Sequence, residues 1–292
     1  MKTTSLYLKK TGLMVITIIL MLVASGAIAQ DGLLYRISGN GLEQPSYIYG
    51  TIHLICPDDF RVPEAAQKAF SQTDKLVLEL DMDDPGFAAK MQQSAVNPGM
   101  KNISSEIGAE DREVINAFFK KHYSADLTQL GVLKPFTLLS MMYLKGLECP
   151  QPASYENEFV QMAHNDEKEV YGLEEISDQM GIFDTLSTDT QIGWMVDFAS
   201  NDKVLPAEVD ELISIYKSGD IEKLYEASAN SVRYRDLAEP LLHVRNHNWI
   251  SHIISYAEES PAFFAVGAAH LGSENGVIAL LKEKGYTVEQ VQ

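Results

Sequence analysis

The chain of 292 residues is poor in basic side chains and in cysteine. It carries 23 lysines and arginines against 41 acidic residues, for a formal net charge of −18. Nucleic acids and anionic lipid surfaces both require a basic protein surface, so this balance argues against both as partners. Also missing are a glycine-rich phosphate loop, a G-x-S-x-G elbow and a C-x-x-C pair. Their absence disfavours nucleotide binding, serine hydrolase chemistry and thioredoxin-like redox chemistry.

Long apolar runs are missing as well, except near the N-terminus. A basic stretch with Lys9 and Lys10 precedes the apolar run 13–23, and residues 27–29 form an A-x-A cleavage site. The apolar run is short for a membrane span. We therefore predict a signal peptide over 1–29, an exported bacterial protein that is periplasmic or secreted, and no stable membrane insertion after cleavage. An uncleaved N-terminal anchor is the alternative.

Export bears on the only two cysteines, Cys56 and Cys149. Both would lie in an oxidising compartment, where a disulfide can persist. A bond between them would tie the segment after His53 to the end of a helical region. Two unpaired buried thiols are the alternative, because the sequence does not give the distance between them. Neither cysteine stands in a recognisable nucleophile setting.

What the sequence does contain is a Gly-x-x-His pattern that occurs twice, near opposite ends of the mature chain. The first copy, with His53, follows the strand-like run 47–49, and the second, with His270, follows the apolar run 263–266. A glycine at a strand exit permits a positive φ and lets other groups approach the backbone closely. The histidine then projects at the carboxyl edge of the sheet, where α/β folds build their sites. Imidazole is both a common metal ligand and a general base.

Each copy alone is explained as well by a histidine that merely completes a turn, since a pattern with two fixed positions arises easily by chance. Two copies in matching settings favour a paired site.

Two carboxylates are candidate partners of this pair. Glu79 lies in the compact strand-like run 75–81, and Glu174 stands at the exit of the short run 169–173. An unpaired charge in such a place is costly, and a metal, an arginine or a proton would each relieve the cost. For Glu174 a favourable charge at a helix N-terminus is the alternative.

The predicted helix 239–257 supplies a further candidate. Its apolar stripe is interrupted by Asn246 and flanked by Arg245. A polar amide in that position needs hydrogen-bond partners, so we expect the helix to line a site or to cap a strand end. His243 and His247 are four residues apart, but Val244 stands where the H-E-x-x-H zinc motif has glutamate.

The order of patterns predicts an α/β fold. Strand-like runs cluster towards both chain ends and helical spacing fills the region between them. We expect one domain over 30–292, with a central mixed sheet and a large helical insertion. The predicted strands are 33–37, 46–51, 75–81, 169–173, 262–266 and 286–291.

Together the motif-bearing segments resemble the TraB/GumN family, which includes PrgY-like proteins and is similar to the Tiki membrane proteases. The resemblance covers essentially the whole mature chain. It implies a fold related to the erythromycin-esterase and ChaN group. The segments that carry it are 47–53, 78–81, 172–174 with Gln179, 245–246, 264–271 and 276–288.

The resemblance also implies a divalent-metal-dependent hydrolase, most consistent with a peptidase whose partner is a peptide or protein substrate. The metal would be Mn, Co or Zn, and it would activate water and polarise the carbonyl. Glu174 would be a general base or fourth ligand, Arg245 an oxyanion stabiliser and Asn246 an orienting residue. The candidate metal ligands are His53, Glu79 and His270, and the candidate catalytic residues are Glu174, Arg245 and Asn246.

A non-catalytic protein that sequesters a peptide or small ligand on the same fold is the alternative. PrgY-like relatives are linked to blocking a peptide signal, which fits capture as well as cleavage. The Tiki proteins are membrane-tethered, whereas this chain shows only the predicted signal peptide. Substrates at a membrane surface are therefore not implied.

Overall fold

The computed structural model of the chain describes residues 32–201, 203–231 and 235–291. The predicted signal peptide lies outside this part. Within it, no helix is both long enough and apolar enough to cross a membrane.

A six-stranded sheet forms the centre, in the order β4-β3-β5-β2-β1-β6. The first four strands in that order run parallel, whereas β1 is antiparallel to both of its neighbours. This arrangement confirms the predicted α/β class with a mixed sheet built from both chain ends. The strands are β1 (Leu34–Ser38), β2 (Ser46–Thr51), β3 (Lys75–Leu78), β4 (Glu169–Gly172), β5 (Ala262–Gly267) and β6 (Thr287–Gln290).

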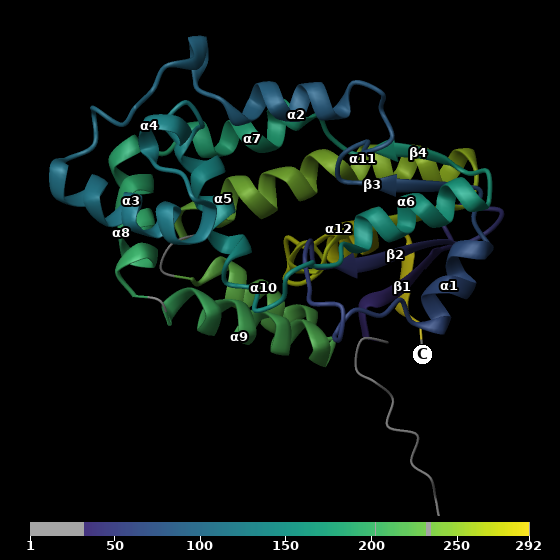
Figure 1. Cartoon of the computed structure of the whole chain (residues 1–292). Coiled ribbons are helices and arrows are strands. Elements are labelled where there is room, and N and C mark those ends of the chain that lie inside the picture. The colour runs from purple at the N-terminus through teal and green to yellow at the C-terminus, as the bar shows by residue number, and fades with distance from the viewer. Residues whose placement is uncertain (1–31, 202, 232–234, 292) are drawn as a thin grey trace, which may run out of the picture.

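Helices fill the long connections and cover both faces of the sheet (Figure 1). They are α1 (Glu64–Ser71), α2 (Phe87–Ala95), α3 (Ala109–Tyr123), α4 (Leu127–Leu130), α5 (Pro135–Leu144), α6 (Tyr155–Asn165), α7 (Ile176–Asp184), α8 (Thr188–Ser200), α9 (Val204–Ser218), α10 (Ile221–Ala229), α11 (Val244–Glu259) and α12 (Val277–Glu283). Short turns of 3-10 helix occur at Pro98–Met100, Arg235–Leu237 and Ala268–His270, and one π-helical turn, Glu239–His243, leads into α11.

The alternation of side chains along β5 shows how the core divides. Phe263 and Ala265 face one apolar cluster, which includes buried residues of α1, α6 and α9. Phe264 and Val266 face the opposite cluster, which includes the buried stripe of α11 and the apolar face of α12. Successive side chains of a strand point to opposite faces, so a strand apolar throughout must be covered on both.

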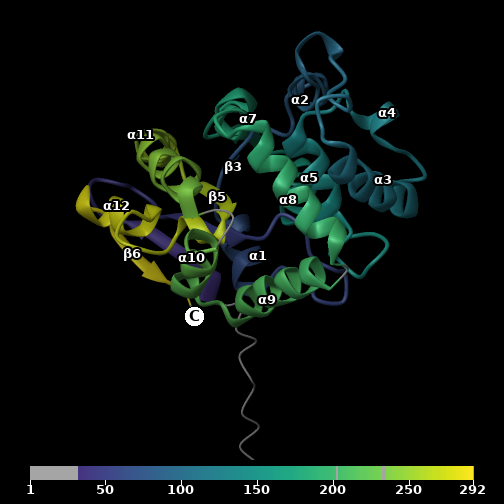
Figure 2. The same ribbon diagram turned by 90° about the vertical axis from the view of Figure 1, so that its left-hand side faces the viewer.

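A third apolar cluster belongs to the helical insertion. Buried residues of α3, α4, α5 and α8 pack on one another there, away from the sheet. Figure 2 shows these helices gathered beside the half of the molecule that holds α11 and α12. The prediction of one domain over 30–292, and the relation to the erythromycin-esterase and ChaN group, remain predictions.

One predicted strand is shorter than expected. The run 75–81 forms a strand only as far as Leu78. Beyond Leu78, the carbonyl of Glu79 still accepts hydrogen bonds from Leu173 N and Glu174 N. The Glu79 carboxylate accepts hydrogen bonds from Gly267 N and from the Arg245 side chain. The end of this strand therefore belongs to the site described next.

Candidate functional site

Four polar side chains follow the carboxyl ends of the four parallel strands. In sheet order, Glu174 follows β4, Glu79 follows β3, His270 follows β5 and His53 follows β2. Parallel strands end at the same edge, so the topology itself sets these side chains in one row. These residues therefore lie at the carboxyl edge of the sheet, where the sequence predicts the site.

The two Gly-x-x-His glycines serve close approach. A Cβ added to Gly50 would lie 2.8 Å from Cβ and 3.0 Å from Cα of Ala268, which belongs to the second copy of the motif. A Cβ on Gly267 would lie 3.2 Å from Glu79 Oε1. Neither glycine is among the described residues with positive φ, so that part of the expectation was wrong. The two turns pack directly on one another, and this close approach is possible because Gly50 and Gly267 have no side chain.

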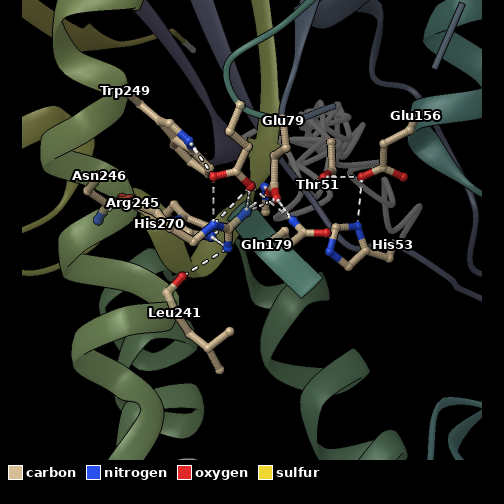
Figure 3. Close-up of polar contacts among 12 residues, drawn as sticks. Thr51, His53, Glu79, Glu156, Gln179, Leu241, Arg245, Asn246, Trp249 and His270 are labelled. Carbon is tan, nitrogen blue, oxygen red and sulfur yellow. Dashed lines mark hydrogen bonds and ion pairs between the residues drawn. The ribbon is translucent and has the colours of Figure 1, made fainter. Parts of the chain in front are cut away.

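Arg245, in the first turn of α11, is the hub of the row (Figure 3). Its Nη2 donates to Glu79 Oε2 at 2.5 Å and to Glu174 Oε1 at 2.6 Å, and its Nε donates to Glu174 as well. Nη1 donates to the Leu241 carbonyl in the preceding π-helical turn and to His270 Nε2 at 3.1 Å. A guanidinium shared by two carboxylates makes charge-assisted hydrogen bonds of the strong kind.

The contacts of His270 define its protonation. Arg245 can only donate, so Nε2 of His270 must accept. Nδ1 lies 2.6 Å from Oδ1 of Asn246, whose amide nitrogen donates to the carbonyls of His270 and Asn275. The network therefore assigns a neutral imidazole with its proton on Nδ1. Asn246, which interrupts the apolar stripe of α11, is used to orient this histidine.

Burial and charge act on these groups in different directions. Burial raises the pKa of a carboxyl group, but at Glu79 the nearby Arg245 outweighs it and holds the pKa well below its usual range. Burial dominates at Glu174 and raises its pKa despite Arg245. Burial also lowers the pKa of His270 to about 3, in agreement with the neutral form that its contacts require.

Trp249 and Gln179 complete the buried network. Trp249 Nε1 donates to Glu174 Oε2, and its ring lies against the Arg245 guanidinium at 4.7 Å. Gln179, on α7, donates to one oxygen of Glu79 and to one of Glu174. Both carboxylates are thus surrounded by donors, as buried carboxylates must be.

His53 has a different setting. Its side chain is 69% exposed, whereas that of His270 is 6% exposed. Nδ1 lies 3.2 Å from Oε1 of Glu156, on α6, and the same oxygen accepts a hydrogen bond from Thr51. Desolvation lowers the pKa of His53, but Glu156 outweighs it and raises that pKa above its usual value. No described residue bonds to Nε2, so this nitrogen is open.

The segment after His53 is tied to the segment before Glu156. Ile55 and Ala153 form an isolated β-bridge with two backbone hydrogen bonds. The disulfide between Cys56 and Cys149 lies beside it, as the sequence indicated. Bridge and disulfide together hold two segments far apart in the chain at the distance that the His53–Glu156 pair needs.

Comparison with known proteins fits this geometry. The sequence pattern of the TraB/PrgY/gumN family matches residues 33–290. The chain belongs to the TraB/PrgY/gumN family. It is also similar to "Metalloprotease TIKI1" of Danio rerio, with 22% identity over 310 residues. That alignment covers 85% of this chain and spans 61% of the length of the fish protein. No solved structure matches the chain significantly.

For this TraB/PrgY/gumN protein, the structure brings together most of the residues that the sequence singled out. Arg245 contacts Glu79, Glu174 and His270, and Asn246 contacts His270. The catalytic and ligand roles assigned to them from the resemblance remain predictions. His53 stands at the exposed end of the row, where its hydrogen-bond partner is Glu156.

No pattern in the sequence singles out Glu156. It lies 103 residues from His53 along the chain, in a segment with ordinary helical spacing. The one available signal is a glutamate in the first turn of a helix that follows a cysteine predicted to pair near His53.

The predicted ligands do not form a metal site in this arrangement. Among the described residues, no group of three or more His, Cys, Asp or Glu side chains is placed to hold an ion. The reason is visible in the contacts: the lone pairs of His270 Nε2 and Glu79 Oε2 both receive hydrogen bonds from Arg245. The residues of this TraB/PrgY/gumN protein are therefore arranged around a guanidinium.

A pocket of about 1100 Å³ adjoins one end of the row. Its walls come from α2, α7, α11 and the exits of β3 and β4, and it meets the network at Glu174, Arg245 and Trp249. His53, Glu79 and His270 are not among its lining residues. The pocket and the exposed histidine thus lie at opposite ends of the same polar row.

Proposed function

We propose that this chain is a hydrolase that cleaves peptide bonds, with His53 as the group that moves the proton. The observation that carries the proposal is the geometry of that side chain. Glu156 fixes Nδ1 and leaves Nε2 open to solvent at the carboxyl edge of the sheet. A histidine oriented through one nitrogen and open at the other is the arrangement that general bases use.

In this proposal the neutral His53 accepts a proton from water at Nε2 as the water oxygen bonds to the carbonyl carbon. The imidazolium then returns that proton to the departing amine as the C–N bond breaks. Glu156 stabilises the charged ring between these two steps. Because the pKa of His53 is raised, the neutral form is favoured at alkaline pH, so the rate should increase with pH through that pKa.

The similarity to a protein named as a metalloprotease supports a metal-dependent form of this proposal. In that form His53, Glu79 and His270 would hold a Mn, Co or Zn ion, whose chemistry would be to activate water and polarise the carbonyl. Glu174 would serve as general base or fourth ligand, Arg245 as oxyanion stabiliser and Asn246 as an orienting residue, as the family resemblance implies. It requires Arg245 to leave Glu79 and His270, so no step of the mechanism above is assigned to a metal.

The test is cleavage of a peptide library by the purified chain without its leader, followed by mass spectrometry. The His53→Ala variant should be slower by about 10²–10⁴-fold, the usual contribution of a general base. Glu156→Gln should lose less. Cleavage by His53→Ala at the parental rate would refute the role of His53. A chelator arm, with Mn²⁺, Co²⁺ or Zn²⁺ added back, tests the metal-dependent form separately.

Capture of a peptide or small ligand without turnover is the second candidate function, and the pocket favours it. The pocket is large enough for a ligand of several side chains, and its lining does not include His53. If capture is the function, a peptide that binds the protein should be recovered intact and in stoichiometric amount after long incubation. Its affinity should be unchanged by His53→Ala.

Export to the periplasm or outside the cell also belongs to the proposal. The disulfide is compatible with an oxidising compartment. To test this, the full chain would be expressed and its periplasmic and cytoplasmic fractions assayed by immunoblot. The expected result is a periplasmic protein that has lost the mass of residues 1–29.

A further inference from the structure

The two Gly-x-x-His turns differ at the residue that follows the glycine. The first turn has Thr51 at this position, and the second has Ala268. Both side chains are buried, at 2% and 3% exposed. The first turn therefore carries a buried hydroxyl group where the second carries only a methyl group. A buried hydroxyl group needs a hydrogen-bond partner.

The partner of the Thr51 hydroxyl is the carboxylate of Glu156 (Figure 3). Thr51 Oγ1 donates to Glu156 Oε1 at 2.7 Å, and His53 Nδ1 lies 3.2 Å from the same oxygen. An ionised carboxylate can only accept, so the threonine and the histidine both donate to it. Ser154 Oγ donates to the other oxygen, Oε2, at 2.9 Å. Each oxygen of Glu156 is thus held by one hydroxyl group.

The two residues that share Oε1 are held differently by the fold. Thr51 is the last residue of β2 and pairs with Gly267 of the parallel strand β5. His53 lies beyond the strand, and its side chain is 69% exposed. Buried side chains are fixed by close packing, whereas exposed side chains on connecting segments are more mobile. The Thr51 hydroxyl is therefore able to fix the carboxylate, and the carboxylate in turn orients the histidine.

We propose that Thr51 is a positioning residue, whose hydroxyl fixes the Glu156 carboxylate so that it orients the His53 ring and leaves Nε2 free to accept a proton. This inference deepens the proposed function and rests on His53 as its general base. Thr51 is buried, so it acts through Glu156 and not on the substrate. Ser154 is a second anchor, on the oxygen that His53 does not contact.

The tautomer of His53 links the Thr51 hydroxyl to the reaction. A neutral imidazole carries its proton on Nδ1 or on Nε2, and only the form protonated on Nδ1 has a lone pair on Nε2. The carboxylate opposite Nδ1 selects that form. If the carboxylate could rotate away, both forms would be populated, and the form protonated on Nε2 cannot act as the base. The second turn needs no such hydroxyl, because Asn246 orients His270.

The test compares Thr51→Val, which removes the hydroxyl, with Thr51→Ser, which keeps it, in the full mature chain. The substrate is one library peptide that the parent cleaves. A hydrogen bond to a charged group contributes a factor of about 10–100, so Thr51→Val should lower kcat by about that factor. KM should not change, because the buried side chain does not contact the substrate. Thr51→Ser should keep most of the parental kcat.

Nitrogen NMR of the His53 ring gives a second readout that does not require turnover. At alkaline pH, where the ring is neutral, the parent and Thr51→Ser should carry the proton on Nδ1. Thr51→Val should instead show both tautomers. If the parent cleaves no peptide, the proposed function fails, and the tautomer alone decides whether Thr51 positions His53.

A matched control is Thr73→Val, which removes another buried threonine hydroxyl, one that donates to the Phe70 carbonyl ahead of β3. It should change neither kcat nor the tautomer. Thr51→Ala, which copies Ala268 of the second turn, is a second variant if Thr51→Val does not fold. A parental tautomer in the variants without the hydroxyl would overturn the proposal. Equal losses of kcat in Thr51→Val and Thr51→Ser, or a loss confined to KM, would overturn it as well.

Discussion

The two Gly-x-x-His turns of this protein are alike in sequence and opposite in environment. Each follows a parallel strand, and each places its histidine at the same edge of the sheet. His270 is buried, hydrogen-bonded by Asn246 and Arg245, and neutral. His53 is exposed and paired with the Glu156 carboxylate, which raises its pKa.

The difference shows what the motif does and does not determine. The glycine and the strand fix where the backbone ends and how closely the two turns approach. The protonation of each histidine is set by groups outside the motif, chiefly Arg245 on α11 and Glu156 on α6. Identical motifs can therefore supply one histidine that organises a buried network and one that meets solvent.

The largest expected effect on stability comes from removing Arg245, which contacts the buried residues of the row. Arg245→Ala leaves Glu79 and Glu174 without their shared cation in a buried place. Breaking a buried ion pair from one side typically lowers the free energy of unfolding by about 3–5 kcal/mol. Urea unfolding followed by circular dichroism measures it. The matched change on the exposed side, His53→Ala, should cost less than about 1 kcal/mol. Similar losses for both would contradict the contrast between the two turns.

Removal of the disulfide should come next. The Cys56→Ser/Cys149→Ser variant opens a loop closed across a sequence separation of 93 residues. Loss of such a bond typically costs about 2–5 kcal/mol. Unfolding in urea, with the parent measured both oxidised and reduced, gives the value. The segment that holds His53 opposite Glu156 should loosen, whereas hydrogen exchange around His270 should change little. Equal changes at the two histidines would show that the disulfide does not act locally.

Adding a methyl group to each glycine sharpens the comparison further. Gly50→Ala places a Cβ 2.8 Å from that of Ala268, and the backbone on both sides leaves little room to yield. Such overpacking costs about 1–3 kcal/mol. Gly267→Ala meets the Glu79 side chain at 3.2 Å, which can shift slightly, so its loss should be smaller. A larger loss for Gly267→Ala, in the same urea experiment, would mean that the contact between the turns is not the reason for glycine.

The smallest expected effect concerns Glu156→Gln. A histidine whose folded pKa is raised contributes stability below its unfolded pKa of 6.5, and this contribution is lost as pH rises through the folded pKa. Without the carboxylate, the free energy of unfolding should depend less on pH in this range. The change should stay below about 1 kcal/mol because the ring is largely exposed. Unfolding free energies of parent and variant across that pH range provide the comparison. An unchanged alkaline slope would remove Glu156 as the cause.

Much of the sheet side of this picture could be predicted from sequence. Apolar runs that end in glycine predicted β2 and β5 and the positions of their histidines. Glu79 and Glu174 were predicted to need partners because each accompanies a buried run, and an arginine was one of the three partners considered. The polar break at Asn246 in an apolar stripe predicted a helix that either lines a site or caps a strand end, and in the structure Asn246 contacts His270.

The rest depends on distances that a single sequence does not contain. Nothing in the local pattern of α6 indicates that Glu156 lies beside His53, because the contact is made by the tertiary path of the chain. Nor does sequence show whether the cation between two carboxylates is a metal or a side chain. The choice is decided by the reach of Arg245 from the first turn of α11.

The most direct test of the account is a titration of the two histidines by nitrogen–proton NMR of the imidazole rings. His53 should be protonated at neutral pH and should lose its proton only at higher pH, because Glu156 raises its pKa. His270 should stay neutral, with the proton on Nδ1, down to a pKa of about 3. The acid form of a buried neutral histidine is favoured in the unfolded chain, so stability should fall as pH drops below 6.5. Two histidines that titrate together near the ordinary value would contradict the account.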